Sequence, residues 1–387
     1  MKIADIKVHY RYFGDRSWVL TEMRTDEGIT GWSEVGKNRE RGVGMMIEEM
    51  TSFLLGKDPT RIEQLYEQLY RMNFWTGTTE LTAVSALEMC MWDILGKSLN
   101  APVYKLMGGP FRDTIRLYAH VYPEGEKTPA GFAAGAKERV AAGYTALKTT
   151  VDHLGLARSR GAGDDPRQRQ VFREGEAVSN RLIDSAREFI GAIRDAVGPN
   201  VDLMVDCHGR FGPADAIRLG SALEDLRLLF FEEPCPPENV EAVMMVSRAL
   251  RTPVATGERL LGRHGFWDLC DKNGVAVVQP DITNAGGFAE TKKIAAMAES
   301  RYMTVAPHNP NGALAMAQNA HLCATIPNFL ILETLGHPEH RVACGVALKE
   351  PLVVKDGYLE LPQGPGWGVE PDPADLAANL WRTPGHF

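Results

Sequence analysis

The sequence has no long apolar run, no cluster of basic residues and no signal-peptide pattern. Nowhere in its 387 residues does an apolar stretch approach the roughly 18 residues that a membrane helix needs, so no membrane partner is expected. Residues 1–14 alternate like a strand and lack the apolar core of a signal peptide, which predicts a cytoplasmic protein. The net charge is −8 without a Lys/Arg-rich run, so nucleic acid is not an expected partner. An anionic substrate would need a local positive charge, such as a bound cation.

Cysteines are few and scattered. No two of the six form a Cys-x-x-Cys pair, so in a cytoplasmic chain they are expected to be free thiols. Zinc prefers clustered thiolates or histidines, and a structural zinc site is therefore not expected. The six are Cys90, Cys207, Cys235, Cys270, Cys323 and Cys344.

Residues 1–112 combine strand and helix patterns. Alternating apolar and polar side chains, with a turn at Asp26, Glu27 and Gly28, indicate a small antiparallel sheet. Helical periodicity follows, and together these patterns predict an α+β domain. The predicted strands cover 2–10, 17–24 and 29–35, and the predicted helices cover 41–55, 60–72 and 78–97.

From residue 113 onward, eight short apolar runs alternate with helix-like segments. Almost continuously apolar strands in this alternation predict a TIM-type (β/α) barrel of seven to eight strands over residues 113–355. A doubly wound sheet would want a Gly-rich turn after its first strand, and the sequence has none there. Residues 356–387 are turn-rich and are expected to return onto the first domain. The apolar runs cover 115–121, 144–151, 201–206, 226–233, 253–258, 275–281, 302–308 and 329–334.

About thirty residues separate the second of these strands from the next helix. This segment, residues 151–180, is rich in Gly, Arg and Asp, which is typical of a surface loop. In a barrel such a loop would overhang the active-site end, where it would act as a lid or specificity loop. The alternative is a solvated insertion without a role.

An ionisable residue ends each of six consecutive predicted strands, from the third to the eighth. Barrel enzymes place their active sites at this end of the strands. One acid there would be explained as a helix cap or a loop ion pair, but six in register predict a functional site. The six, spaced 23 to 27 residues apart, are Asp206, Glu232, Glu258, Asp281, His308 and Glu333.

Three of these residues, Asp206, Glu232 and Glu258, are carboxylates on adjacent strands. Without a cluster of Lys or Arg they would repel one another, and a hard divalent cation removes that repulsion. Mg²⁺ takes a few carboxylates and keeps positions open for substrate oxygens, whereas all-oxygen ligation argues against zinc or copper. The three are therefore predicted to be metal ligands.

His308 and Asp281 end neighbouring strands. A carboxylate hydrogen-bonded to one imidazole nitrogen fixes the tautomer and raises the basicity of the other, which predicts a general base. The alternative is a histidine whose hydrogen bonds are satisfied in the core.

Three further side chains are candidates near the same end. His208 lies two residues past Asp206, so on a continuing strand it would share the face of that ligand and could donate a proton to a departing hydroxyl. Arg210 would hold a substrate hydroxyl or carboxylate. Lys148, at the end of the second strand, would neutralise a substrate carboxylate, unless it is an ordinary surface lysine.

The segments VDCHGRF, FFEEP, TGER, QPDITNAGG, APHNPNG and LET together resemble the enolase superfamily, in its mandelate-racemase-like branch. Within that branch the chain looks most similar to acid-sugar dehydratases of the galactonate type. The resemblance covers nearly the whole chain, including an N-terminal α+β capping domain. It implies Mg²⁺ on Asp206, Glu232 and Glu258, an enediolate intermediate stabilised by the metal, and His308 as the base paired with Asp281.

The same resemblance implies roles for two more residues. His208 matches the histidine that acts as the acid for loss of the leaving group. Glu333 matches the glutamate that hydrogen-bonds the substrate carboxylate or the enediolate. Racemases carry Lys-x-Lys on the second strand, whereas this chain has Lys148, Thr149 and Thr150. Thr150 cannot act as a second base, and this departure favours elimination over racemisation.

The sequence thus predicts a magnesium-dependent hydro-lyase. It would remove the C2 proton of a galactonate- or gluconate-like aldonic acid and eliminate the C3 hydroxyl, giving a 2-keto-3-deoxy sugar acid. The alternatives are a lactone or anhydro-sugar acid cycloisomerase, an epimerase, and a non-catalytic sugar-acid binding protein. A homo-oligomer is expected, because these barrels often associate. Specificity would come from the capping domain, through Tyr12, Phe13, Arg16 and Trp75, unless these side chains serve ordinary packing.

Overall fold

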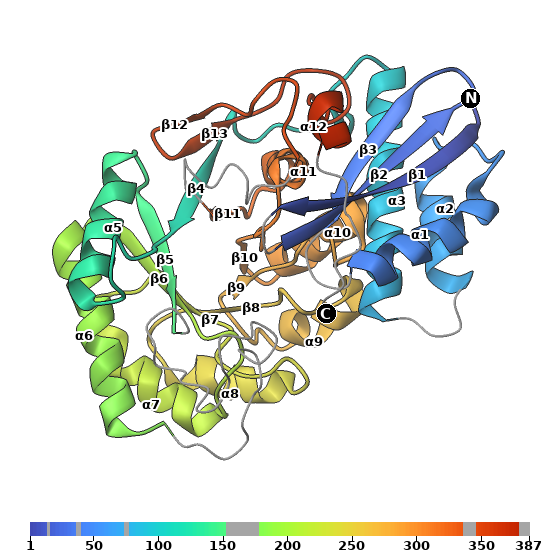
Figure 1. Ribbon diagram of the computed structural model, residues 1–387. Helices are drawn as coiled ribbons and strands as arrows, with labels where there is room; N and C mark the ends of the chain where they lie inside the picture. The colour runs from blue at the N-terminus through green and yellow to red at the C-terminus, as the bar shows by residue number, and fades with distance from the viewer. Residues whose placement is uncertain (14–15, 36–39, 73–76, 152–177, 336–345, 379–387) are drawn as a thin grey trace. The chain divides into compact units, whose positions relative to one another are not determined.

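A computed structural model describes residues 1–13, 16–35, 40–72, 77–151, 178–335 and 346–378 (Figure 1). The chain forms two compact units. The first contains Met1–Leu117, Glu258–Trp267 and Gln279–Phe387, and the second contains Tyr118–Gly257 and Asp268–Val278. Most of the predicted 151–180 loop, and Trp75, lie outside the described residues.

The N-terminal part of the first unit is an antiparallel sheet with helices beside it, drawn in blue in Figure 1. The sheet has the order β1-β2-β3, and every element predicted from the sequence is present to within a few residues. The strands are β1 (Ile3–Phe13), β2 (Arg16–Thr25) and β3 (Thr30–Val35), and the helices are α1 (Glu40–Leu54), α2 (Ile62–Met72), α3 (Thr78–Ser98) and α4 (Val103–Leu106).

Helix α3 is the central helix of this part. Fifteen of its 21 residues are buried, which is unusual for a helix that also carries polar side chains. Thr82, Ser85 and Glu88 recur every third residue, so they lie on one face of the helix. This polar stripe contacts a segment far along the chain, described below.

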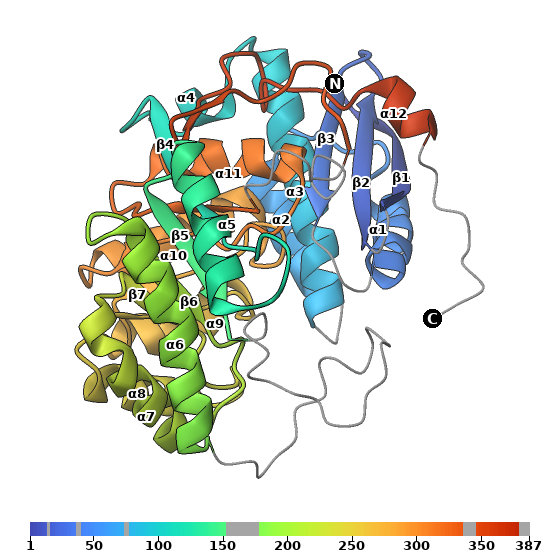
Figure 2. The same cartoon turned by 60° about the vertical axis from the view of Figure 1, so that its left-hand side comes forward.

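The second unit contains parallel strands in the order β4-β5-β6-β7-β8-β9. Helices α5 and α6 pack against each other, with Phe132 and Phe189 edge to face at 5.8 Å (Figure 2). The strands are β4 (Thr114–His120, beginning in the first unit), β5 (Ala146–Thr150), β6 (Asp202–Asp206), β7 (Phe230–Glu232), β8 (Val254–Thr256) and β9 (Val277–Val278). The helices are α5 (Pro129–Ala141), α6 (Asn180–Val197), α7 (Pro213–Leu223) and α8 (Val240–Ala249), with a 3₁₀ turn at Glu224–Leu226.

Three of these helices begin where a polar side chain caps the first turn. Thr128, Ser179 and Asn239 each accept a hydrogen bond from the backbone N–H three residues on, at the starts of α5, α6 and α8. A capped N–H no longer needs water, so these residues determine where each helix starts.

The C-terminal part of the first unit continues the alternation of helices and strands. Its hairpin β12-β13 joins the start of β4 by antiparallel pairing, and the Trp367 N–H donates to Asp93 of α3 at 2.9 Å. The elements are α9 (Gly262–Asp271, ending in the second unit), α10 (Gly287–Glu299), β10 (Thr304–Val305), α11 (Ala313–Thr325), β11 (Leu332–Thr334), β12 (Val354–Lys355), β13 (Tyr358–Glu360) and α12 (Pro373–Ala378).

All eight predicted barrel strands are present, but most are shorter than the apolar runs that predicted them. As a result Asp206 and Glu232 end their strands, whereas Glu258, Asp281 and His308 lie two or three residues past theirs. Some candidate site residues therefore lie at strand ends, and others lie in the loops that follow the strands.

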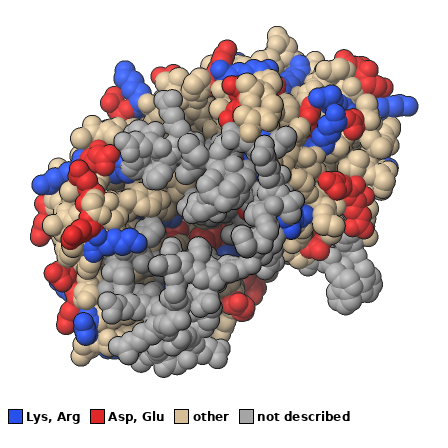
Figure 3. Space-filling model, viewed as in Figure 1, with Lys and Arg blue, Asp and Glu red and all other residues tan. Residues whose placement is uncertain are grey.

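The five described cysteines are buried free thiols, and Cys344 lies outside the described residues. Among the described helices, none is both long enough and apolar enough to cross a membrane. On the face drawn in Figure 3, Lys and Arg side chains are interspersed with Asp and Glu.

Candidate active site

In the second unit, Asp206 and Glu232 lie side by side at the ends of β6 and β7. Their Cα atoms are register partners in the parallel sheet, and both side chains are buried. Lys148 of β5 reaches them from the next strand, with its Nζ 2.8 and 3.1 Å from the two carboxylate oxygens of Glu232. The same Nζ lies 5.0 Å from the centre of the Tyr118 ring. Lys148 is thus a buried partner of a predicted metal ligand and not a surface lysine.

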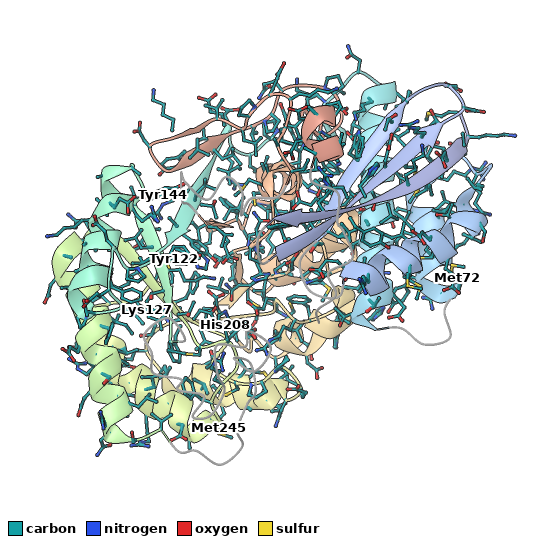
Figure 4. All side chains as sticks on the ribbon, viewed as in Figure 1. Met72, Tyr122, Lys127, Tyr144, His208 and Met245 are labelled. Atoms are coloured by element: carbon teal, nitrogen blue, oxygen red, sulfur yellow. The ribbon has the colours of Figure 1, made fainter. Side chains whose placement is uncertain are left out.

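His208 lies beside Asp206, but not for the reason predicted from the sequence. Strand β6 ends at Asp206, and His208 has a φ of 49°, so strand alternation does not extend to it. Instead the chain turns back: the His208 N–H donates to Asp206 Oδ1 at 2.7 Å, and its Nε2 lies 2.7 Å from Oδ2. The His208 side chain is 40% exposed, the most accessible member of this group (Figure 4).

The charges around Asp206 favour its ionised form. Burial would raise the pKa of Asp206, but the charge and hydrogen bonds of His208 and the charge of Lys148 outweigh burial and lower that pKa below its usual range. A carboxylate in this setting stays ionised and available as a ligand.

Glu233 holds the backbone around this group. Its φ is 43°, which turns its side chain away from that of Glu232. The Glu233 carboxylate accepts the N–H of Gly257 at 3.0 Å and the hydroxyl of Thr256, while its carbonyl accepts the N–H of Gly209 at 2.7 Å. Glu233 therefore has a structural role, and it fixes Gly257, the residue that precedes Glu258 in the chain.

In the first unit, His308 lies among three carboxylates. Its Nδ1 is 2.8 Å from Asp281 Oδ2, and its Nε2 is 3.4 Å from Glu258 Oε2 and 4.0 Å from Glu333 Oε2. The other oxygen of Asp281 accepts the N–H and the hydroxyl of Thr283, at 2.8 and 2.7 Å. Asp281 is held from both sides, so it can fix the tautomer and orientation of the imidazole.

The three carboxylates keep the proton on His308. Burial would lower the pKa of His308, but the charges of Glu258 and Glu333 and the hydrogen bond to Asp281 raise it to about 10. This arrangement has a strong affinity for positive charge, whether it is carried by a proton or by a cation.

Glu333 is positioned by two asparagines that the sequence reasoning did not consider. The N–H of Asn309 donates to Glu333 Oε2 at 2.7 Å, and its side-chain amide donates to the Glu333 carbonyl at 3.3 Å. The Asn319 amide, from α11, donates to Asn309 Oδ1 at 3.3 Å. The sequence feature that could have indicated this role is the position of Asn309 directly after His308.

His120 was also missed, although the first predicted barrel strand contains it near its end. It is the register partner of Lys148, is nearly buried, and stacks with Tyr122 at a ring distance of 6.2 Å. The available signal was an ionisable residue near the end of the first predicted strand, one strand before that of Lys148.

The structure gives less detail for the predicted substrate-binding residues. Arg210 is half-buried, with its N–H donating to the Cys207 carbonyl at 3.1 Å. The backbone of Tyr12 pairs with Ser17 and that of Arg16 with Phe13 where β1 meets β2, while their side chains lie outside the described residues.

Comparison with known proteins identifies relatives along the whole chain. Residues 2–108 match the mandelate racemase / muconate lactonizing enzyme N-terminal domain, and residues 131–375 match the enolase C-terminal domain-like family. The chain is 34% identical over 379 residues to a D-galactonate dehydratase of Ralstonia pickettii, covering 95% of this chain and 93% of that protein. It is 33% identical over 375 residues to a D-xylonate dehydratase of Haloferax volcanii, covering 95% and 86%.

A solved structure, that of a mandelate racemase/muconate lactonizing enzyme from a Sulfitobacter species, superimposes with a TM-score of 0.89. The two chains are 35% identical, and the match covers 100% of this chain and 97% of the other. The predicted fold class, a TIM-type barrel with an N-terminal α+β capping domain, is confirmed. The predicted enzyme class, a hydro-lyase, is also confirmed. The chain belongs to the mandelate racemase / muconate lactonizing enzyme family of the enolase superfamily.

Proposed function

We propose that this enzyme dehydrates an aldonic acid of the galactonate or gluconate type. It removes the C2 proton and eliminates the C3 hydroxyl, giving a 2-keto-3-deoxy sugar acid. The names of its relatives support the substrate class, since they are dehydratases of D-galactonate and D-xylonate. The chemistry rests on the His308–Asp281 pair, whose two side chains lie 2.8 Å apart.

His308 is the general base of this proposal. A base has to be the neutral imidazole, which requires the negative charge around His308 to be offset first. In that form Nδ1 is engaged by Asp281, so Nε2 is the nitrogen left to receive a proton. That nitrogen faces Glu258 and Glu333. The substrate carboxylate would bind on this side of the imidazole. Glu333, fixed by Asn309, would have to carry a proton in order to donate a hydrogen bond to the substrate carboxylate as negative charge develops on its oxygens.

A divalent cation, Mg²⁺, would be held by Asp206, Glu232 and Glu258. The donor set fits, because each residue offers a carboxylate oxygen, and Asp206 and Glu232 are adjacent and buried, with the pKa of Asp206 lowered by its surroundings. When bound, such a cation polarises the substrate carboxylate and offsets the negative charge around His308. Lys148 compensates the remaining charge on Glu232 and holds that side chain in place.

His208 would donate the proton to the departing C3 hydroxyl. Its ring is partly exposed, and its Nε2 lies 2.7 Å from Asp206 Oδ2. Arg210, Tyr12, Arg16 and Trp75 are proposed to contact the sugar chain.

A single base distinguishes this proposal from racemisation or epimerisation. Thr150 occupies the position of a second lysine, is buried, and is the register partner of Asp206. A threonine hydroxyl does not act as a base at neutral pH, so a proton removed from one face of C2 would not be returned to the other.

The domain division into residues 1–112, 113–355 and 356–387 also remains a proposal. The two family matches, which end at residue 108 and begin at residue 131, support a boundary between them.

The proposal is tested by offering D-galactonate, D-gluconate, D-xylonate and a panel of aldaric acids to the protein with Mg²⁺. A 2-keto-3-deoxy product is expected from at least one of them. A product without a keto group would instead identify a cycloisomerase or epimerase. Binding of these acids without turnover would identify a sugar-acid binding protein.

A further inference from the structure

Two buried helices begin directly after the loops that carry the proposed base and its partner. Helix α10 follows the loop of Asp281, and α11 follows the loop of His308. The first N–H groups of any helix have no partner within the helix, and in a buried setting each needs an acceptor from elsewhere.

Glu34, at the end of strand β3, provides that acceptor for α11. The N–H of Gly312 donates to the Glu34 carboxylate, and the N–H groups of Leu314 and Ala315 also donate hydrogen bonds to it. The Glu34 side chain is fully buried, and burial raises its pKa to about 7 against the opposing effect of these N–H groups. Glu34 lies 278 residues before Gly312 in the sequence.

Glu88, on helix α3, does the same for α10. Its two oxygens accept the N–H groups of Phe288 and Ala289, each at 2.9 Å, and burial raises its pKa to about 7. The carboxylate approaches so closely that a Cβ at Gly287 would lie 2.3 Å from its Oε2. Gly287 also has a φ of 88°, so both space and backbone conformation require glycine there.

The polar stripe of α3 extends this contact back toward Asp281. The hydroxyl of Thr82 donates to the Asn284 side chain at 3.1 Å, and the Gly286 N–H donates to the Ser85 hydroxyl at 3.0 Å. At the start of the loop, the Ala285 N–H donates to the Asp281 carbonyl at 2.7 Å. One face of α3 therefore holds the loop that ends in α10.

On α11 the connection runs through asparagines. Asn319 holds Asn309, which follows His308 in the chain and binds Glu333. The position of α11 therefore determines where Asn309 and Glu333 lie, and Glu34 holds the N-terminus of α11.

Capping a helix with a buried carboxylate has a high desolvation cost. A serine or asparagine would satisfy an N–H without placing a full charge away from water. What the carboxylate adds is a charge-assisted hydrogen bond, strengthened by the positive end of the helix dipole. Two such contacts, each at a helix next to one member of the same pair, indicate precise placement of that pair.

We propose that Glu34 and Glu88 are positioning residues through which the N-terminal domain holds His308, Asp281 and Glu333 in their working geometry. This inference rests on the proposed function, because it assumes the roles of those three residues. The two glutamates do not touch the substrate and act only through α10, α11 and the loops before them.

The test compares Glu34→Gln and Glu88→Gln with the matched control Asp93→Asn. Asp93 is also a fully buried carboxylate that accepts backbone N–H groups, but its donors are Trp32 and Trp367 and not the first N–H groups of α10 or α11. Glutamine keeps the shape of glutamate and one acceptor oxygen while it removes the charge. Thermal unfolding of all three variants shows how much stability each has lost.

Three measurements follow on the full chain with Mg²⁺ and the aldonic acid of highest turnover. These are kcat, KM, and exchange of the C2 proton with solvent in D₂O. A shift of the base of about 1 Å costs up to about 100-fold in rate, so kcat and exchange should fall by 10- to 100-fold with little change in KM. Asp93→Asn should keep kcat at a similar loss of stability.

Proton NMR gives a readout that needs no turnover. The His308 Nδ1 proton, bonded to Asp281, should give a downfield signal in the wild type and in Asp93→Asn, and that signal should weaken or move in both glutamine variants. If the glutamine variants match Asp93→Asn in kcat, exchange and this signal, the positioning role is overturned. If one variant does not fold, the other decides. If the wild type dehydrates none of the acids, the proposed function is wrong. The NMR signal would still test the positioning role.

Discussion

In the second unit, buried carboxylates lie against basic side chains, whereas in the first unit a single histidine lies among carboxylates. Lys148 and His208 accompany Glu232 and Asp206, and they lower the pKa of Asp206. Around His308 the balance is reversed, and its pKa is raised to about 10. The same kinds of residue therefore lower the pKa of a carboxyl group in one place and raise the pKa of an imidazole in the other.

This contrast suggests a division of labour within the proposed reaction. In that reaction the second unit would supply buried carboxylate ligands and a partly exposed acid. The first unit presents a base whose proton affinity is set by its carboxylate neighbours. Each prediction below either breaks this division or sharpens it.

The largest expected effect is on His308→Asn. Without an imidazole the C2 proton cannot be removed, so both dehydration and C2 proton exchange should fall by about 10²–10⁴-fold. The measurements are keto-acid formation and exchange in D₂O, with the exposed His264→Asn as the control. Exchange at the wild-type rate in His308→Asn would show that another group is the base.

His208→Asn should separate the two steps. If His208 supplies the proton to the leaving hydroxyl, dehydration should fall by about 10²-fold or more, while C2 proton exchange continues. Product formation and exchange are measured on the same sample. Equal losses in both would mean that the second-unit group also takes part in proton removal, and the division would be wrong.

Metal removal tests the ligand group without relying on turnover. Mg²⁺ at 100 times its Kd should raise the free energy of unfolding by about 2.7 kcal/mol, and a chelator should reverse this. Asp206→Asn should lose the increase, whereas Asp202→Asn, at the other end of β6, should keep it. Thermal or denaturant unfolding with and without Mg²⁺ provides the measurement. An unchanged increase in Asp206→Asn would exclude that residue as a ligand.

A smaller effect, on the free energy of unfolding, is expected at His321, a second buried histidine of the first unit. The Tyr104 N–H donates to its Nδ1 at 3.1 Å, and its Nε2 lies 3.0 Å from the Trp367 carbonyl, so the ring is held neutral. Burial lowers its pKa to about 4, against 6.5 unfolded. Its contribution of up to about 3 kcal/mol is present above pH 6.5 and is lost as the pH falls through about 4.

The measurement is the free energy of unfolding between pH 4 and 7 for the wild type and for His321→Asn. The variant should be less stable at pH 7 and should show a flatter dependence on pH in this range. Equal slopes would mean that His321 does not carry the acid sensitivity. The comparison sharpens the main contrast, because two buried histidines of one unit would then differ only through the groups around them.

Much of the fold could be predicted because its patterns are local. The helix expected over residues 78–97 is found at Thr78–Ser98, where Glu80 accepts the N–H of Gly77 at the start of the helix. Strands were predicted too long, because apolar residues continue past the last hydrogen-bonded pair. That error also explains why strand alternation was wrongly extended to His208, whose position depends on a positive φ that no periodicity reveals.

The site could be predicted in part for the same reason. Spacing alone indicated that Asp281 and His308 would be neighbours, and the structure brings them within 2.8 Å. The roles of Glu34, Glu88 and Asn319 could not be predicted, because each depends on a contact with a distant segment or on the exact turn of a loop. A glutamate near the end of a strand, or inside a helix, looks like any other in the sequence.

The close approach of Glu88 to Gly287 has a consequence for how the family varies. Any side chain at position 287 would collide with that carboxylate, whereas a smaller residue at position 88 would remove the obstacle. The two positions should therefore change together among relatives, with glycine retained wherever a glutamate faces it. A homologue that combines this glutamate with a bulky residue at the glycine position would have to begin its α10 in a different way.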